Sequence, residues 1–585
     1  MASANYRNTS VEHLTATVGL ELKAAQGIHY KSVDDLLGGN QWIDVDPFAE
    51  RDIKELATNI GLTQADIANV KQNDLRNPDA AAGKGDKFGY NYRINMANAK
   101  VWAQNEWKWN EVDLYYALQL SYNYLQRSSD MINGRAWYLA KLNPDYAWYY
   151  LANNADAILA GNYDAVAGRM AGAHHHFVDP AFKVGATYKI NGRNHLKINA
   201  MAETKAPLGR DAYISPRVHD RATEAIYRHD YAAYYAQQYG TSFLQEYFGA
   251  SQKIVGGDLT YSFNYPIVRG RVTAFYTQFW NGPELNGYYD DEARTFVNQS
   301  LTGINRRHMG VEAAAAVKLG TYFTLTGVLS LGDYRYTSNA LAITSAENGM
   351  ALAEDGDRAL NDPNRGPIFE LRDSVLLKGL HVATGPQLNT SLKLSFFHPK
   401  MWFADVTVNY FDWNYLDYAP ARRMQGLFTG TRADGSKVNG WYNEAMQTTD
   451  GNIAQMNLEG GYPNNAVLGQ DGVPVLKYPY SIMSNQEMLT ASNPLHRFLV
   501  DVSVGKLIYL PNRQSISINL TVNNLLNNTH FKTGGYQQAR LPRQTKQGLE
   551  NDKVVSVISP NAWKFPSKYY YAWGTNFYLN IQYKF

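Results

Sequence analysis

Four tyrosines in the stretch IYRHDYAAYYAQQY are spaced so that they could bind a ligand by stacking. Residues that share one face of a helix over 226–239 are Tyr227, Tyr231, Tyr234 and Tyr235. Aromatic rings in such a row stack well against sugars or other aromatic groups. The plainer interpretation is that the rings only pack a loop against itself, and the sequence leaves both open.

Three adjacent histidines in GAHHHF form the one metal-like cluster, His174, His175 and His176. Adjacent side chains on extended backbone point to opposite faces, so at most two of these imidazoles could bind one ion. We therefore interpret the cluster as the end of an interfacial loop, and we predict no metal site.

Enzymatic signatures are absent from the sequence. It contains no cysteine, which excludes thiolate catalysis, thiolate metal ligation and disulfides, and it contains no H-E-x-x-H, G-x-S-x-G or Walker A motif. The net charge of +2, without a Lys/Arg-rich block, gives no reason to expect nucleic acid as a partner. The sequence predicts a protein that is not an enzyme and carries no cofactor.

The last ten residues, NFYLNIQYKF, alternate between apolar and polar with the period of a β-strand. The apolar row consists of Phe577, Leu579, Ile581, Tyr583 and Phe585. Such a strand could be the edge of a soluble sheet. It could also be the closing strand of an outer-membrane β-barrel, with its apolar row facing lipid and its terminal aromatic at the membrane interface.

Similar alternation recurs along the whole chain and predicts about 14 strands. The runs lie near residues 11–26, 88–107, 111–125, 181–190, 193–204, 252–264, 270–281, 304–318, 321–336, 382–397, 400–414, 496–509, 515–524 and 576–585. Many of them exceed the 9–11 residues that a tilted membrane strand needs.

Short and long links alternate between these runs, as in outer-membrane barrels. The tight links are WNE, NGR, YPIVRG, LGT, HPK and LPNRQ. The long links lie near 31–86, 127–178, 205–250, 337–380, 415–495 and 528–569. We expect an all-β, transmembrane antiparallel barrel with the tight turns in the periplasm and the long loops outside the cell.

Composition agrees with a membrane barrel. The mean hydropathy is −0.42, and no run of about 18 apolar residues appears, which excludes a helical membrane protein. The 43 tyrosines and 12 tryptophans suit membrane interfaces, since their rings are apolar with a polar edge. The start, MASANYRNTSVEHLTATVGLEL, lacks the pattern of a secretory signal, so we expect a mature or truncated piece.

Several segments resemble TonB-dependent outer-membrane receptors. They are the last strand, VNNLLN about sixty residues before the end, GIHYKSVDDLLGGNQWIDVDPFAERD, YKINGRNHLKINA, DDEARTFVNQSLTGINRRHMGVE and HPKMWFADVTVNYFDWNYLDYAPARRM. Their order along nearly the whole chain is similar to the receptors with an N-terminal carboxypeptidase-regulatory-like domain. The resemblance implies that residues 1–585 are the C-terminal portion of a 22-stranded barrel, whose plug domain, TonB box and signal peptide are not in this chain.

The resemblance implies import of a scarce nutrient, such as a siderophore, vitamin, peptide or glycan. The implied partners are outer-membrane lipid, the TonB complex through the missing N-terminal part, the barrel-assembly machinery and a surface lipoprotein. Phe585 and its row resemble the signal that the assembly machinery reads. Two alternatives remain open: a self-standing porin-like passive channel, and a barrel enzyme or adhesin.

Overall fold

The protein is described by a computed structural model. The described residues are 1–47, 49–50, 63–142, 151, 155–163, 170–171, 174–209, 213, 251–290, 295–346, 370–423, 486–539 and 566–585, with strand fragments at 429–432, 437–439, 446–447, 453–454, 545–546 and 554–558.

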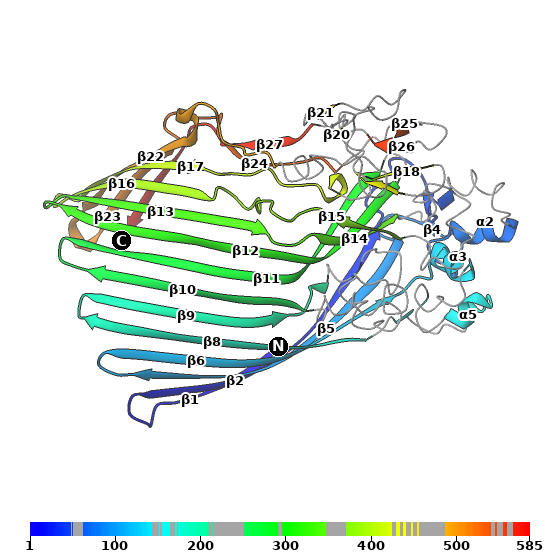
Figure 1. Ribbon diagram of the computed structural model, residues 1–585, viewed down its shortest axis with the longest axis horizontal. Helices are drawn as coiled ribbons and strands as arrows, with labels where there is room; N and C mark the ends of the chain where they lie inside the picture. Colours follow the sequence, from blue (N-terminus) through cyan, green and yellow to red (C-terminus); the bar gives the residue numbers. More distant parts are fainter. Residues whose placement is uncertain are drawn as a thin grey trace.

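A single antiparallel sheet of 18 strands dominates the described chain (Figure 1). Three short strands add to its loop end: β7 (Met170–Ala171), β14 (Ala340–Ala346) and β15 (Glu370–Val375). The other fifteen form a continuous wall, in which each strand pairs with the next wall strand along the chain. They are β1 (Ala2–Asn8), β2 (Leu14–Ser32), β5 (Lys87–Lys108), β6 (Val112–Ser129), β8 (His175–Asn191), β9 (Asn194–Lys205), β10 (Gln252–Asn264), β11 (Val268–Asp290), β12 (Thr295–Leu319), β13 (Phe323–Tyr336), β16 (Leu388–His398), β17 (Trp402–Asp412), β22 (Phe498–Tyr509), β23 (Ser515–Asn523) and β28 (Asn576–Lys584).

The predicted alternation of links is confirmed. Tight turns join the wall strands at one end of the sheet, and the strand ends that the long links connect lie at the other end (Figure 1). We call these the turn end and the loop end. The wall has one strand more than expected, because the short and largely polar β1 was not recognised from its sequence.

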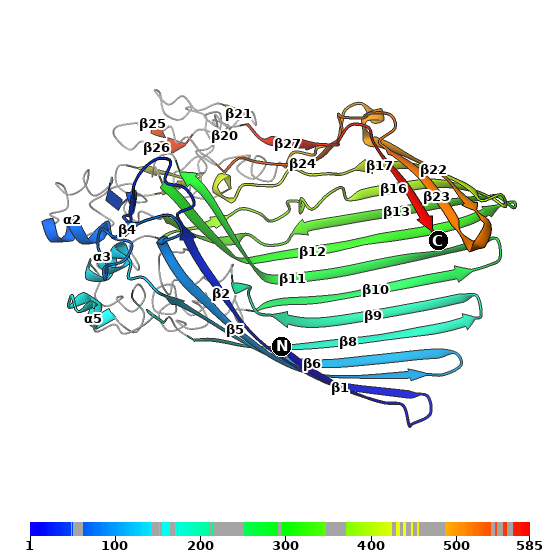
Figure 2. The ribbon, with the colours of Figure 1, turned by 180° about the vertical axis from the view of Figure 1, so that it is seen from behind.

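The wall curves into a trough with two open edges. Figure 2, from behind, shows β2 and β28 in front of the middle strands, so the concave side faces the viewer there. Among the described residues β1 pairs only with β2, and β28 only with β23. Since β1 and β28 are the first and the fifteenth strands of an antiparallel wall, they run in the same direction.

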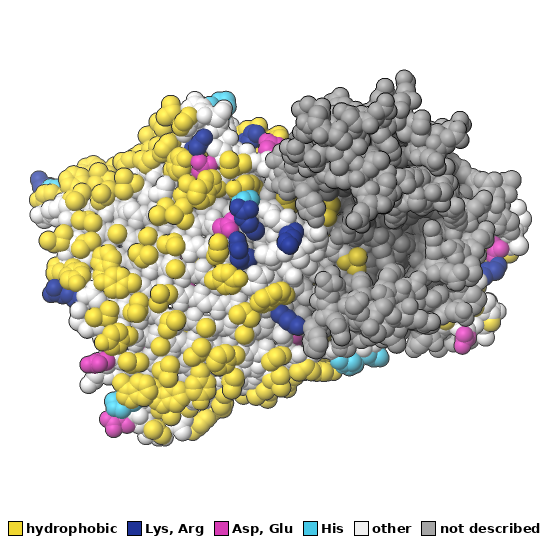
Figure 3. All heavy atoms as spheres, viewed as in Figure 1, with side chains coloured by type: hydrophobic (Ala, Val, Ile, Leu, Met, Phe, Trp, Pro, Cys, Tyr) yellow, Lys and Arg dark blue, Asp and Glu magenta, His cyan; other side chains and the backbone are white. Residues whose placement is uncertain are grey.

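The convex outer face of the wall is apolar. Side chains alternate between the faces of a strand, and the outer positions carry large apolar residues that nothing in the described chain covers (Figure 3). Examples on successive strands are Val18, Val101, Leu120, Ile198, Leu259, Val272, Val311, Leu392, Val406, Val504 and Leu520. A contiguous surface of this kind over a whole sheet is that of a transmembrane β-sheet facing lipid.

The concave inner face is mainly polar, and its aromatic side chains lie over glycines of neighbouring strands. Trp102 of β5 crosses Gly19 of β2, where an added Cβ would lie 2.3 Å from the indole Cε2. Phe275 of β11 covers Gly310 of β12 in the same way, with an added Cβ at 2.8 Å from the ring. These positions need glycine because the aromatic ring occupies the space of a side chain.

Smaller elements lie at the loop end. The helices are α2 (Gln64–Val70), α3 (Gly134–Leu142) and α5 (Ala155–Leu159), with 3-10 turns η4 (Pro420–Arg422), η6 (Pro494–Arg497) and η7 (Pro511–Arg513), the last at the turn end. The short strands are β3 (Trp42–Ile43), β4 (Ala81–Ala82), β18 (Thr429–Arg432), β19 (Lys437–Asn439), β20 (Met446–Gln447), β21 (Ile453–Ala454), β24 (Lys532–Tyr536), β25 (Thr545–Lys546), β26 (Val554–Ile558) and β27 (Lys568–Tyr571). Helix α2 begins with a capping box in which Thr63 and Asp66 satisfy each other's backbone N–H groups. None of the described helices is long and apolar enough to cross a membrane.

Candidate functional site

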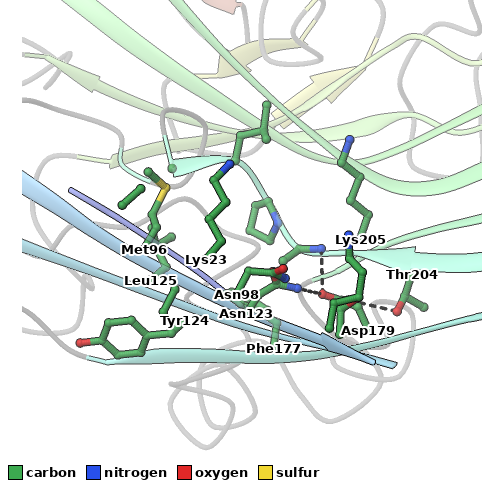
Figure 4. Close-up of a pocket in the computed structure, with 18 of the residues that line it drawn as sticks. Lys23, Met96, Asn98, Asn123, Tyr124, Leu125, Phe177, Asp179, Thr204 and Lys205 are labelled. Carbon is green, nitrogen blue, oxygen red and sulfur yellow. Dashed lines mark hydrogen bonds between the residues drawn. The ribbon is translucent and has the colours of Figure 1, made fainter. Parts of the chain in front are cut away.

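A cavity of about 410 Å³ opens on the inner face of the wall towards its loop end (Figure 4). Its floor is formed by inner positions of β2, β5, β6, β8 and β9, and its roof by the segment 206–209, which leaves β9 and turns inward. The floor is polar because inner positions of these strands alternate with the apolar outer ones. The cavity is therefore a pocket in the wall of the trough and not part of the lipid-facing surface.

Asp179 of β8 holds the roof of the cavity in place. Its carboxylate accepts hydrogen bonds from Asn123 Nδ2 at 2.6 Å, from Thr204 Oγ1 at 3.0 Å and from the backbone N–H of Ala206 at 3.2 Å. Figure 4 shows Asp179 between Asn123 and Thr204, with the ring of Tyr124 pointing away from the cavity. The carboxylate is 3% exposed, so these three donors replace the water that it would otherwise bind.

Apolar contacts complete the roof. At Gly209 an added Cβ would lie 3.3 Å from both Ile94 Cγ2 and Met96 Sδ, and 3.6 Å from Leu125 Cδ1. Ile94 and Leu125 belong to a small buried cluster with Phe177, against which Ala206 packs. Ala206 and Gly209 are small enough to allow this close approach to the wall.

The charges that line the cavity are mixed, with three ammonium groups and two carboxylates. The lysines are Lys23, Lys100 and Lys205, and the acids are Asp179 and Glu203. Lys100 lies 3.9 Å from Glu21, whereas Lys23 and Lys205 have no ion-pair partner in the described part of the chain. Unpaired ammonium groups beside amide and hydroxyl side chains suit a polar ligand with acidic or oxygen-rich groups.

A cationic side chain also lies between aromatic rings beside the cavity. The guanidinium of Arg127 is 4.1 Å from the ring centroid of Tyr92 and 5.5 Å from that of Tyr213. Tyr92 stacks in turn on His29, with centroids 4.9 Å apart. This stack stiffens the inner face of β2, β5 and β6 just beyond the cavity.

A second polar group lies at the loop end, where the exposed Asp417 precedes the buried Tyr418 in the chain. Asp417 belongs to the segment that follows β17, and its backbone pairs with Gly535 and Gln537. Partial burial, followed by repulsion from Glu284, raises the pKa of its carboxyl to about 6. The hydroxyl of Tyr418 donates to Glu284 Oε2 at 3.3 Å, and burial raises the pKa of this phenol well above its usual range. Tyr418 packs into the buried core at the loop end, and neither residue lines the cavity.

Of the predicted site residues, the histidines lie in the described part of the chain and the four tyrosines lie outside it. Tyr227, Tyr231, Tyr234 and Tyr235 lie outside the described residues, so the stacking surface stays a prediction. His174 and His176 share one face, with ring centroids 6.5 Å apart, and their imidazoles contact the hydroxyls of Tyr124 and Tyr122. His175 points to the other face and is 1% exposed. No group of three metal-binding side chains is found in the described residues.

The last strand places its apolar row on the outer face. Phe577, Leu579, Ile581 and Tyr583 of β28 pair with the outer residues of β23, and Phe585 at the end is 94% exposed. The lipid-facing position of the row follows from this register. Its role as an assembly signal stays a prediction.

The cavity itself was not predicted from the sequence. Asp179 lies next to Pro180, a residue that argues against the interior of a strand, so the predicted strand began only at residue 181. The inward turn of 206–209 lies in a predicted long loop and carries no signal of its direction.

Comparison with known proteins gives matches only among solved structures. No family model matches the chain, and no curated protein matches it. It is similar to the ferric-catecholate import receptor Fiu of E. coli K12, with 12% identity, a TM-score of 0.42 and coverage of 99% of this chain and 53% of that one. It is also similar to the copper transporter OprC, with 9% identity, a TM-score of 0.41 and coverage of 98% of this chain and 56% of that one. For the ferric yersiniabactin uptake receptor FyuA from Yersinia pestis the identity is 9%, the TM-score is 0.43, and the coverage is 99% of this chain and 52% of that one. The chain thus spans about half the length of these structures.

Proposed function

We propose that this chain is the C-terminal barrel portion of a TonB-dependent outer-membrane transporter. The observation that carries the proposal is the contrast between the two faces of the same fifteen strands, apolar outside and polar inside. Tight turns at one end and long links at the other are typical of outer-membrane barrels, and in this proposal the turn end lies in the periplasm and the loop end outside the cell.

The directions of the edge strands support the assignment to a longer barrel. Because β1 and β28 run the same way, an antiparallel ring needs an odd number of further strands between them. Seven such strands would complete the 22 of the receptors that the sequence resembles. A self-standing porin-like channel made of this wall alone would instead need a parallel seam, so the transporter is the better supported of the two.

In this proposal the intact receptor binds its cargo at the loops and passes it along the inner face. The cargo is a scarce nutrient such as a siderophore, vitamin, peptide or glycan, and force from the TonB complex acts through a plug that belongs to the rest of the receptor. The cavity beneath 206–209 is a contact on this route, where Lys23 and Lys205 are available to acidic or oxygen-rich groups of the cargo. A surface lipoprotein would cover the long loops.

The test is made on the protein purified from outer membranes. Its intact mass and its single-channel conductance in planar bilayers are measured on one sample. A mass well above 65.8 kDa together with a closed channel is expected for a plugged receptor of which this chain is a part. A mass of 65.8 kDa together with steady, large conductance would overturn the proposal in favour of the passive channel.

A further inference from the structure

Two arginines face each other on the outer face of the wall. Arg307 of β12 is directly opposite Arg335 of β13 in the antiparallel register. Like charges in directly opposed positions of a sheet are destabilising on their own. One carboxylate lies between them: Asp333 accepts from Arg307 Nη2 at 2.8 Å and from Arg335 Nε at 2.6 Å. Two cations therefore share a single anion.

The arginine pair lies at the loop-side border of the apolar surface. Towards the turn end, the outer rows of the two strands are apolar or glycine: Met309, Val311, Ala313, Ala315 and Val317 on β12, and Leu331, Leu329, Gly327 and Leu325 on β13. Asp333 is ten residues from the start of β13 at Phe323, which corresponds to about 25 Å along the membrane normal for a strand tilted by about 40°. That is the height of the apolar band of such a barrel, so the charges lie at the level of the lipid headgroups.

Neighbouring groups hold this patch without neutralising it. Arg335 Nη1 donates to the carbonyl of Gly379 at 3.3 Å, and His381 lies 3.9 Å from Asp333. The ring of His381 stacks on Tyr415 with centroids 3.8 Å apart. Burial lowers the pKa of His381, which keeps this imidazole neutral at pH 7. With two guanidinium groups, one carboxylate and a neutral imidazole, the patch thus carries a net charge of about +1.

Donors of the patch remain available to a ligand. The Nε–H of Arg307 is buried and has no hydrogen-bond partner in the described part of the chain. The side chains of Arg307 and Arg335 are 31% and 41% exposed, so their outer edges are open. Figure 3 shows basic, acidic and histidine side chains grouped among apolar ones over the loop-side ends of β12 and β13.

We propose that Arg307 and Arg335 bind the phosphate group of an anionic membrane lipid in the leaflet on the loop side. Two guanidinium groups offer several N–H donors in planar forks, which match the oxygens of a phosphate. The lipid supplies the second anion that the opposed arginines lack, while its acyl chains lie along the apolar rows below. This inference rests on the membrane placement proposed above and is independent of the cargo.

The test compares three variants of the full protein in lipid discs. R307Q/R335Q removes both cations, and D333N removes the competing carboxylate. The matched control is K506Q, which removes an outward cation at the turn end, where Lys506 lies 4.4 Å from the ring centroid of Trp402. Native mass spectrometry measures the phosphatidylglycerol retained from discs of phosphatidylcholine that contain a minority of phosphatidylglycerol.

We expect R307Q/R335Q to retain phosphatidylglycerol about tenfold more weakly, since charge-assisted hydrogen bonds to phosphate are lost. K506Q should behave as the wild type, and D333N should bind at least as tightly as the wild type. Equal losses in D333N and R307Q/R335Q would mean that the three residues form only an internal ion-pair network, and would overturn the proposal. So would unchanged retention in R307Q/R335Q, or tight binding of inorganic phosphate to the wild type in place of the lipid.

The dependence on membrane placement is resolved in the same series. If the wild type enters discs of phosphatidylcholine alone, but shows no selectivity for phosphatidylglycerol in the mixed discs, only the lipid site is overturned. If the wild type fails to enter such discs, the membrane placement falls, and the lipid site falls with it.

Discussion

The backbone N–H of Ala206 donates to the carboxylate of Asp179, 27 residues earlier in the chain and on a different strand. This bond fixes the point at which the chain leaves β9 and turns inward over the cavity. In Asp179→Asn the new amide nitrogen cannot accept from the Ala206 N–H or from Asn123. We expect amide hydrogen exchange at Ala206 to become about tenfold faster or more, as the loss of a hydrogen bond to a buried carboxylate costs about 1–3 kcal/mol.

The matched control for this exchange experiment is Asp258→Asn. Asp258 also lies on the inner face and accepts from Asn199 Nδ2 at 2.9 Å, but it has no contact with 206–209. The same rise in exchange at Ala206 in both variants would show that the roof responds to any lost carboxylate and is not held by Asp179.

Gly19 is predicted to be intolerant of any side chain while Trp102 is present. Gly19→Ala would place a Cβ 2.3 Å from the indole, and overpacking of this kind costs about 1–3 kcal/mol in the free energy of unfolding. Urea unfolding in vesicles, followed by tryptophan fluorescence, measures this cost. In the double variant with Trp102→Ala most of the cost of Gly19→Ala should disappear, because the two changes share one contact.

Gly192 in a tight turn provides the control for that cycle. An added Cβ there meets no atom within 4 Å, so Gly192→Ala should change stability by less than about 0.5 kcal/mol. Simple additivity of Gly19→Ala and Trp102→Ala would contradict the contact between the two residues.

The raised pKa of Asp417 predicts that the stability of the fold depends on pH. Its pKa of about 6 lies above the ordinary value of 3.8, so the folded state binds this proton more tightly than the unfolded state does. The stabilisation by the protonated form is full below pH 4 and is lost as the pH rises through 6. Because the Asp417 side chain is also open to solvent, Asp417→Asn should raise the free energy of unfolding at pH 8 by only about 1 kcal/mol relative to the wild type, and by much less at pH 4.

The measurement is chemical unfolding of wild type and Asp417→Asn across pH 4–8. The asparagine keeps the oxygen that accepts from the Tyr418 N–H at 3.0 Å, so the local fold is retained. A stability difference that does not vary with pH would refute the assignment of this titration to Asp417.

Deletion of Phe585 is expected to reduce assembly and to leave binding intact. The residue follows β28 at the turn end and is 94% exposed, with its ring centroid 6.2 Å from that of Tyr583. The amount of protein in the outer membrane should fall, while ligand affinity per folded molecule stays the same. Quantitative blotting of membrane fractions checks the first point, and normal membrane levels would refute the role in assembly.

The wall was predictable from the sequence because alternation of side chains is a local property. The row of Leu118, Leu120 and Tyr122 was expected on one face of a strand, and all three are exposed on the outer face of β6. The turn-to-loop alternation was likewise readable, since NGR and HPK are short and contain turn-forming residues.

The inner face was less predictable, because its contacts join residues far apart in the chain. Trp102 and Phe275 are aromatic residues at inner positions, where hydropathy alone would favour the lipid side. Only the register, which sets them opposite Gly19 and Gly310, explains their places. The bond of Asp179 to Ala206 depends in the same way on how β8 and β9 meet, and the arginine pair appears only once β12 and β13 are aligned.

The pairing of each wall strand with its successor along the chain has a consequence for how the protein is made. The hairpins that are closed by tight turns bring together residues close in sequence and can form by local zippering, whereas pairs such as β17 and β22 must first close a long loop. The wall can then grow by the addition of preformed hairpins. Growth of this kind is serial: a hairpin that pairs out of register leaves its neighbours with the wrong face to lipid. A single register error in one hairpin would therefore disturb the apolar outer face over several strands.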